Sequence, residues 1–281
     1  MNLTASLGYE DLVAGKASGY DVYVAGSDQI WNPVCVNEKG QLDLGYFLNF
    51  VPKEAKKISY ASSMGGHVYT IEESEIVKRL LASFNHLAVR EKNTQEYLSK
   101  LLDRNVEHVL DPTLLLNKEQ WLEAAETSKR NTQGEYILLY TVPRVPLIKK
   151  VVDYYSKQLG LKVVSLEQGL TAGAKVDQQV RDAGPKEFIK LFANASFVIT
   201  DSFHGTCFAL NFEKLFIAVS PGKHSNRIES LLNLVGLEER LVKEDGEMPK
   251  IPINIDMSVA SEKLNIVRNK SLTYLDIAIG I

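Results

Sequence analysis

Short apolar segments alternate with longer amphipathic segments along most of the chain. A run such as 136–142 (YILLYTV) suits a buried strand, whereas 71–84 carries apolar residues at helical spacing. Strands that alternate with helices in this way are typical of α/β proteins with parallel sheets. Strands are predicted at 21–25, 57–61, 86–89, 107–110, 136–142, 161–166, 197–200 and 215–219. Helices are predicted at 71–84, 91–102, 147–159, 185–195, 205–212, 226–235 and 261–279.

A polar stretch divides this pattern into two halves. Residues 127–134 (TSKRNTQG) contain no apolar side chain and are predicted to link two domains. At about 150 residues per domain, a chain of 281 residues also indicates two. We therefore expect two Rossmann-like domains that face a cleft: an N-terminal domain over 1–130 and a C-terminal domain with a closing helix over 131–281. Because no glycine-rich turn opens the chain, we expect the first domain to lack its opening strand–helix block.

The charge balance excludes a general electrostatic attraction to polyanions. The chain has 32 Lys and Arg against 35 Asp and Glu, a net charge of −3, so neither nucleic acid nor an anionic membrane is an expected partner. Two cysteines, Cys35 and Cys207, are too few for a disulfide framework. No apolar run reaches the roughly 18 residues of a membrane span, and a signal-peptide pattern is missing. The sequence predicts a cytoplasmic protein without a membrane anchor.

Polar and small residues follow the predicted strands at the point where each strand ends. In parallel sheets, ligands bind outside the carboxyl ends of the strands, so these residues are candidates for a binding site. The candidates in the first half are Gly26, Ser27, Asp28, Gln29, Ser63 and Arg90. Those in the second half are Ser202, His204, Gly205, Thr206, Lys223, His224 and Arg227. Trp31, which lies near the first group, is expected to be a core residue.

The segment 200–206 (TDSFHGT) is the strongest of these candidates. A turn rich in hydroxyl groups that leads into a helix presents backbone N–H groups and the positive end of the helix dipole to an anion. His204 at this turn could exchange a proton near neutral pH. In the alternative interpretation, Asp201 and Ser202 only cap the helix and His204 bonds a carbonyl group.

Arg90 directly follows a predicted buried strand, where a guanidinium group could hold an oxyanion with two hydrogen bonds. The alternative is a salt bridge with Glu91 or Asp111. Lys223, His224 and Arg227 place three potential cations near a helix start, either as an anion site or as a solvated basic face.

Motifs for metal ions and for nucleophilic catalysis are missing. His67, His86 and His108 lack metal-ligand spacing, and no Cys-x-x-Cys or His-Glu-x-x-His motif occurs. No Gly-x-Ser-x-Gly, Walker or Gly-x-Gly-x-x-Gly motif occurs either. We expect no metal ion and no bound cofactor.

Six segments of the chain together resemble the polysaccharide pyruvyl transferase family. They are 26–33 (GSDQIWNP), 59–65 (SYASSMG), 89–94 (VREKNT), 109–116 (VLDPTLLL), 184–210 (GPKEFIKLFANASFVITDSFHGTCFAL) and 225–237 (SNRIESLLNLVGL). The resemblance implies a two-domain fold similar to GT-B glycosyltransferases. It also implies transfer of the enolpyruvyl group of phosphoenolpyruvate onto two hydroxyl groups of a cell-surface saccharide, which forms a pyruvate ketal.

The important His and Arg of this family correspond to His204 and Arg90, which we expect to be the catalytic residues. Arg90 and the N–H groups of Gly205 and Thr206 would hold the donor, and His204 would assist protonation of its vinyl carbon. The resemblance implies a saccharide acceptor, free or lipid-linked, and a lipid-linked acceptor would bring the protein transiently to the inner membrane surface. The sequence leaves open the acceptor sugar and the oligomeric state.

Two other functions fit the same architecture. One is a nucleotide-sugar glycosyltransferase, in which the helix at His204 receives a diphosphate, and fold alone does not separate it from a pyruvyl transferase. The other is a non-catalytic relative that only binds sugar. A reaction that depends on phosphoenolpyruvate and not on nucleotide sugars would exclude the glycosyltransferase. Substrate binding without turnover would favour the non-catalytic relative.

Overall fold

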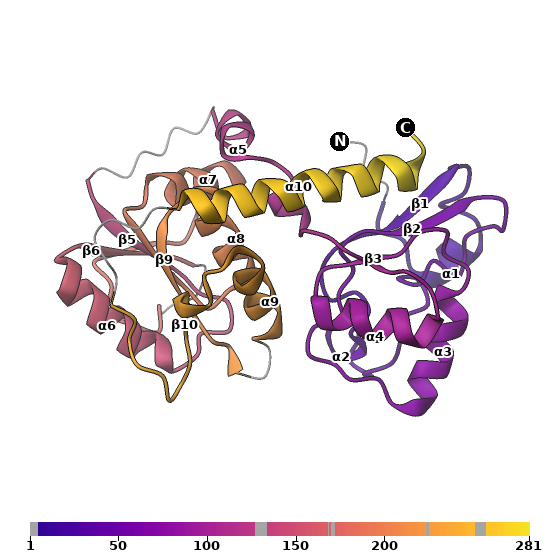
Figure 1. Cartoon of the computed structure of the whole chain (residues 1–281), viewed down its shortest axis with the longest axis horizontal. Helices are drawn as coiled ribbons and strands as arrows, with labels where there is room; N and C mark the ends of the chain where they lie inside the picture. Colours follow the sequence, from indigo (N-terminus) through magenta and orange to yellow (C-terminus); the bar gives the residue numbers. More distant parts are fainter. Residues whose placement is uncertain (1–4, 127–133, 168, 170–171, 223–224, 251–256) are drawn as a thin grey trace. The chain divides into compact units, whose positions relative to one another are not determined.

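The computed structural model describes residues 5–126, 134–167, 169, 172–222, 225–250 and 257–281. They form two units, each with parallel strands (Figure 1). Unit 1 comprises Met1–Pro112 and Val267–Ile281, and unit 2 comprises Thr113–Ile266. The division therefore falls before Thr113 rather than at the expected 130, and the end of the chain belongs with unit 1. Apart from Gly134, the expected linker lies outside the described residues.

Four short parallel strands cross unit 1. β1 (Val22–Ala25) pairs with β2 (Lys56–Ser59), and β3 (Ala88–Val89) pairs with β4 (Glu107–His108). Parallel bridges from Ile58 to His86 and from Ser62 to Val89 connect β2 with β3. The strands therefore follow one another in the order β1-β2-β3-β4, with all their carboxyl ends at one edge.

Several helices accompany these strands in unit 1. They are α1 (Tyr9–Val13), α2 (Pro33–Val36), α3 (Ile71–Leu81) and α4 (Lys92–Leu102). Helix α3 begins where Thr70 and Glu73 form a reciprocal capping box, which satisfies backbone N–H groups at the helix start. Trp31 is 1% exposed and its ring stacks on that of Phe47, so the expectation that Trp31 is a core residue is confirmed.

Unit 2 contains a six-stranded parallel sheet. Its strands are β5 (Tyr136–Tyr140), β6 (Lys162–Leu166), β7 (Gln178–Val180), β8 (Phe197–Thr200), β9 (Leu215–Val219) and β10 (Leu241–Val242). The spatial order is β10-β9-β8-β5-β6-β7. Successive strands are added on one side of β5 as far as β7 and then, from β8 to β10, on its other side. This is the strand order of a doubly wound Rossmann fold, with the switch point between β5 and β8.

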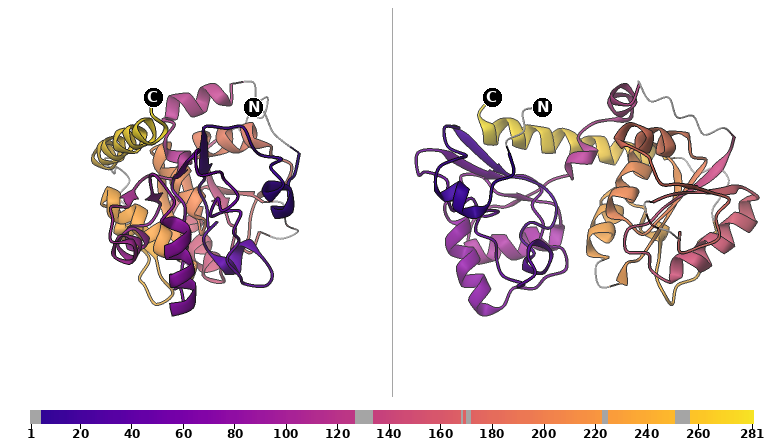
Figure 2. Two further views of the ribbon diagram at one scale, coloured as in Figure 1. Left: turned by 90° about the vertical axis from the view of Figure 1, so that its right-hand side faces the viewer. Right: turned by 180° about the vertical axis from the view of Figure 1, so that it is seen from behind.

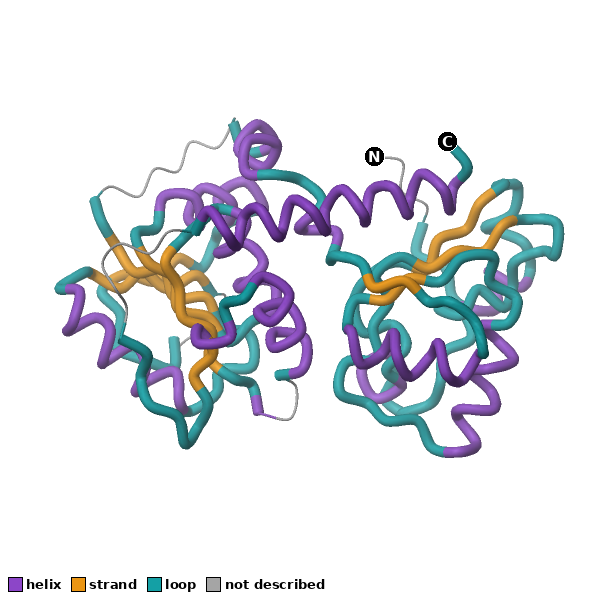
Figure 3. Tube along the Cα trace, viewed as in Figure 1, coloured by secondary structure: helices purple, strands orange, loops and turns teal. Residues whose placement is uncertain are grey.

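Helices lie on both faces of the sheet of unit 2 (Figures 2 and 3). Apolar residues of α6 (Leu147–Leu159) pack against alternate residues of β5, β8 and β9. The remaining helices are α5 (Lys118–Ala124), α7 (Pro185–Asn194), α8 (Phe203–Asn211) and α9 (Asn226–Val235). On the other face, the Tyr136 hydroxyl of β5 donates to the Leu191 carbonyl of α7. A sheet covered on both faces explains why its central strands are continuous apolar runs.

A single helix, α10 (Ser258–Ile279), contributes residues to both units, because the division falls at Val267. Its later part is fixed to unit 1 by hydrogen bonds. The Tyr274 hydroxyl donates to the Ser59 carbonyl at 2.8 Å, and the Ser271 hydroxyl accepts from the Leu110 N–H at 3.0 Å. The closing helix is thus found, but its end belongs to unit 1.

Candidate functional site

Arg90 follows β3 and lies at the carboxyl edge of the unit 1 strands, where it is surrounded by carboxylates. Its Nη1 donates to Asp111 Oδ2 at 2.7 Å and its Nε donates to Glu91 Oε1 at 3.2 Å. Its Nη2 lies 3.4 Å from Asp28 Oδ1. The side chains of Arg90, Glu91 and Asp111 are at most 2% exposed, whereas that of Asp28 is 63% exposed. The salt bridges proposed as the alternative for Arg90 are both present.

The charge of this cluster keeps Arg90 protonated. Burial disfavours the charged guanidinium, but the carboxylates of Glu91 and Asp111 outweigh burial and raise its pKa. Among the described residues, its guanidinium faces the carboxylates of Asp28, Glu91 and Asp111. The hydrogen-bonding edges of Arg90 are therefore directed at groups of the protein itself.

Two more of the predicted residues of unit 1, Ser27 and Ser63, bind the carboxylates that surround Arg90. The Ser27 hydroxyl donates to Asp111 Oδ2 at 2.9 Å, and the Ser63 hydroxyl donates to Glu91 Oε1 at 2.7 Å. Gln29 lies beside Gly65, where an added Cβ would stand 1.9 Å from Gln29 Oε1. Gly26, in contrast, has open space around the position of a Cβ.

In unit 2, the segment after β8 forms a tight turn into α8. The Ser202 hydroxyl accepts from the Gly205 N–H at 3.4 Å, and the Ser202 carbonyl accepts from the Thr206 N–H at 3.0 Å. A Cβ on Gly205 would lie 2.1 Å from Thr200 Oγ1, so only glycine fits against the end of β8. Gly205 and Thr206 use their N–H groups within this turn and determine its shape.

His204 lies half-buried in the first turn of α8. The ring of the preceding Phe203 lies 5.4 Å from the imidazole, edge to face. The guanidinium carbon of Arg227, in α9, lies 5.8 Å from the centre of the same Phe203 ring. The structure thus brings Arg227 to the turn that carries His204. Lys223 and His224 lie outside the described residues.

Asp201, which the sequence treated only as a possible helix cap, connects this turn to the loop after β5. Its two carboxylate oxygens accept from the Val142 N–H at 2.9 Å and the Val145 N–H at 3.1 Å. Burial raises the pKa of the Asp201 carboxyl, against the lowering effect of these N–H groups. Asp201 therefore fixes the shape of the 142–145 loop.

That loop carries Arg144, which the sequence analysis missed. Arg144 has a φ of 57°, a left-handed conformation that costs a side-chain-bearing residue roughly 1–2 kcal/mol. Its Nε lies 3.2 Å from Glu167 Oε2, and the Glu167 side chain is only 3% exposed. The rule that ligand-binding residues follow strand ends, applied to 136–142, would have pointed to the sequence Pro143-Arg144-Val145-Pro146.

The loops of Arg144 and His204 follow β5 and β8, the two strands between which the order of the sheet reverses. In doubly wound sheets, ligands bind in the crevice at this switch point, outside the carboxyl ends of the strands. Tyr140, at the end of β5, lies there too, and burial raises the pKa of its hydroxyl. The carboxyl edge of unit 2 is therefore the strongest candidate site of that unit.

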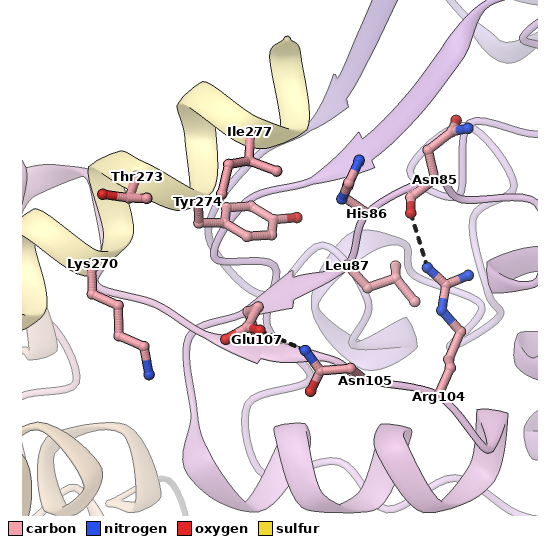
Figure 4. Close-up of a pocket in the computed structure, with 10 residues that line it drawn as sticks. All are labelled: Asn85, His86, Leu87, Arg104, Asn105, Glu107, Lys270, Thr273, Tyr274 and Ile277. Atoms are coloured by element: carbon pink, nitrogen blue, oxygen red, sulfur yellow. Dashed lines mark hydrogen bonds between the residues drawn. The ribbon is translucent and has the colours of Figure 1, made fainter. Parts of the chain in front are cut away.

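A pocket of about 470 Å³ lies elsewhere, at the amino edge of β3 and β4 in unit 1 (Figure 4). One side is formed by the end of α10, with Tyr274 and Lys270, and the other by residues such as His86, Arg104 and Glu107. None of the predicted site residues lines it. It lies at the edge of the sheet opposite to Arg90.

Two further observations concern metals and membranes. The described residues contain no group of three or more His, Cys, Asp and Glu side chains placed to hold a metal ion. In the same part of the chain, no helix has the length and apolar character that a membrane span requires.

Parallel strands in both units, and the doubly wound sheet of unit 2, define an α/β protein of GT-B-like architecture, as the sequence predicts. A model of the polysaccharide pyruvyl transferase family matches residues 4–223. The chain belongs to this family, which confirms the resemblance. Five of the six segments lie within the matched residues, and the sixth, 225–237, lies beyond them. No curated protein matches the sequence.

Solved structures with a similar fold have different sequences. The UDP-GlcNAc 2-epimerase of Methanocaldococcus jannaschii has a TM-score of 0.53 and 12% identity, over 92% of this chain and 73% of the epimerase. A structure of a Methanocaldococcus jannaschii UDP-GlcNAc 2-epimerase in complex with UDP-GlcNAc and UDP gives a TM-score of 0.51 at 12% identity, over 92% and 72% of the two chains. At this identity, the similarity concerns the fold alone.

Proposed function

We propose that the protein transfers the enolpyruvyl group of phosphoenolpyruvate to two hydroxyl groups of a saccharide and so forms a pyruvate ketal. The observation that carries this proposal is the position of His204. This chain belongs to the polysaccharide pyruvyl transferase family. His204 lies at the switch point of its doubly wound sheet, in the first turn of helix α8. A helix start at such an edge favours an anionic ligand.

In the proposed reaction, His204 donates a proton to the vinyl CH₂ carbon of phosphoenolpyruvate, which becomes a methyl group. Positive charge develops on the neighbouring carbon, and one sugar hydroxyl attacks it. Phosphate then leaves with its bonding electron pair, and a second sugar hydroxyl closes the ketal. Of the two hydroxyl protons, one replaces the proton given by His204 and the other leaves with phosphate. His204 therefore acts as a general acid.

The other predicted residues have supporting roles in this proposal. Ser202, Gly205 and Thr206 shape the turn that holds His204, and Arg227 packs beside it. In unit 1 we assign to Arg90 the role of a positioning residue, because its guanidinium is already bound by carboxylates. Asp28 and Gln29 offer oxygen and amide groups to sugar hydroxyls, and we assign them to acceptor binding. The acceptor would be a cell-surface polysaccharide or its precursor, free or lipid-linked.

The test is donor-dependent turnover. The protein is incubated with phosphoenolpyruvate or with UDP- and GDP-hexoses, each with nitrophenyl galactoside, glucoside and mannoside as acceptors. Phosphate release and a ketal-linked pyruvate on an acceptor, seen by mass spectrometry with phosphoenolpyruvate only, are the expected result. UDP or GDP release with sugar transfer would make the protein a glycosyltransferase. Calorimetric binding of phosphoenolpyruvate without phosphate release from any acceptor would favour a non-catalytic relative.

A further inference from the structure

We propose that Arg144 forms an oxyanion-binding site at the switch point of unit 2, which takes a phosphate or carboxylate group of the donor. This inference rests on the proposed function for the identity of the donor, but the site itself is argued from its geometry. Four features carry it: a rigid loop, an oriented guanidinium, its exposure and its position in the sheet.

The loop that carries Arg144 is held in one shape. Pro143 and Pro146 flank it, and proline restricts the backbone of both itself and the preceding residue. The Asp201 carboxylate accepts the N–H groups of Val142 and Val145, on either side of Arg144. A left-handed arginine persists only where its surroundings enforce it, and such residues cluster at binding sites.

The guanidinium of Arg144 is oriented from one side only. Its Nε pairs with the buried Glu167 carboxylate, which also accepts from the Thr141 hydroxyl at 3.4 Å and the Gln179 amide at 3.2 Å. Its Nη atoms lie over Gly169, where an added Cβ would stand 2.2 Å from Nη2. The other edge of the guanidinium, with both Nη groups, has no hydrogen-bond partner among the described residues.

Exposure and position complete the argument. The Arg144 side chain is 41% exposed, so an anion can reach it from solvent. The Asp201 that fixes its loop is followed directly by Ser202, Phe203 and His204. The site and the proposed general acid are thus built on the two strands that flank the switch point. Arginine binds carboxylate and phosphate through two parallel N–H bonds, which is the chemistry offered here.

The test is calorimetric binding of three probes, inorganic phosphate, pyruvate and phosphoenolpyruvate, to the full chain and its variants. Arg144→Ala is expected to raise the Kd of phosphoenolpyruvate by about 10- to 100-fold, as for the loss of a charged hydrogen-bond pair. Arg144→Lys should lie between this variant and the wild type, because it keeps the charge but loses the paired geometry. The phosphate and pyruvate titrations show which group of the donor the site takes.

Gly169→Ala is a second variant that keeps the charge of Arg144 and displaces its guanidinium. It should weaken binding about as much as Arg144→Lys. The matched control is Lys157→Ala, which removes one exposed positive charge from the other end of α6 and should leave every Kd unchanged. Thermal unfolding of each variant verifies that it is folded, and the double variant Arg144→Ala/Glu167→Gln avoids leaving a buried carboxylate without its cation.

The outcomes separate this inference from the proposed function. If Arg144→Ala and Gly169→Ala bind all probes like Lys157→Ala, or if the wild type binds none of them, the Arg144 site is wrong. If phosphate binding depends on Arg144 but no acceptor receives pyruvate, the site stands and the proposed reaction fails. If pyruvyl transfer proceeds with unchanged kcat and KM in Arg144→Ala, the reaction stands and the site fails.

Discussion

Arg90 and Arg144 occupy similar places in the two units, yet their surroundings are opposite. Each follows a parallel strand at the carboxyl edge of its sheet. The side chain of Arg90 is 2% exposed and that of Arg144 is 41% exposed. Within the described part of the chain, Arg90 meets three carboxylates, whereas Arg144 meets one, through its Nε. The position after a strand therefore does not by itself make an arginine an anion site. Whether the guanidinium can bind an anion depends on the protein groups that already surround it.

The groups around the two arginines, at the carboxyl edges of the strands in unit 1 and unit 2, show the same contrast. In unit 1, serine hydroxyls and carboxylates form a closed network around Arg90. In unit 2, Asp201 satisfies the backbone of a loop and leaves Arg144 and His204 accessible, one exposed and the other half-buried. We expect loss of Arg90 to change mainly stability, and loss of Arg144 or His204 to change mainly binding and turnover.

The largest expected effect is on turnover at the edge of unit 2. His204→Ala should reduce kcat of pyruvyl transfer by about 10²–10⁴-fold, because a positioned proton donor is lost, and should leave the unfolding transition in place. Steady-state phosphate release measures the effect. His67→Ala is the matched control, since His67 pairs with Glu73 in unit 1 and should have wild-type turnover. Equal loss in both variants would contradict the assignment.

Arg90→Ala should produce the largest loss of stability. It leaves the buried carboxylates of Glu91 and Asp111 without their cation, which costs about 3–5 kcal/mol for a broken buried pair. Arg144→Ala should cost only about 1–2 kcal/mol, because Glu167 keeps its hydrogen bonds from Thr141 and Gln179. Urea unfolding measures both. Similar losses in the two variants would break the comparison between the arginines.

Two glycines sharpen the comparison further. Gly205→Ala should destabilise unit 2 by about 1–3 kcal/mol, because the new Cβ overlaps Thr200 in a packed turn. Gly26→Ala in unit 1 should change stability by no more than about 0.5 kcal/mol, because its Cβ meets open space. Thermal unfolding at neutral pH tests both. A destabilised Gly26→Ala would show that this turn is packed more tightly than its geometry indicates.

The smallest expected effect is a pH dependence of unit 1. His108, whose Nε2 lies 3.1 Å from the Arg90 carbonyl, has a pKa lowered from its usual 6.5, mainly by burial. The unfolded chain therefore takes up this proton first, so the contribution is complete above pH 6.5 and is lost as pH falls through the lowered value. The slope for one proton is at most about 1.4 kcal/mol per pH unit.

Urea unfolding between pH 7.5 and pH 5 measures this slope, and His108→Gln should reduce it. Burial also lowers the pKa of His86, so part of the slope should remain in that variant. A His108→Gln protein with the full wild-type slope would show that His108 does not contribute.

The sequence predicts the strands whose apolar residues are contiguous, such as β5, β8 and β9, because burial on both faces leaves that pattern. It does not predict β7 (Gln178–Val180) or β10 (Leu241–Val242), which are short, and whose strand conformation depends on pairing with β6 and β9. The turn at His204 can be predicted from the sequence because its residues are consecutive. The contact of Arg144 with Glu167 cannot be predicted in this way, because it depends on the strand order that places β5 beside β6.

The route of the chain has a consequence for the order in which the two units are completed during synthesis. Unit 2 is one continuous segment, whereas unit 1 needs Val267–Ile281 in addition to its first 112 residues. A ribosome delivers these last residues only after all of unit 2 has emerged. Until then, unit 1 lacks Ser271 and Tyr274 and their hydrogen bonds with Leu110 and Ser59. Domains generally fold in the order in which they are synthesised. In this chain, however, synthesis of unit 2 begins later but is completed before that of unit 1.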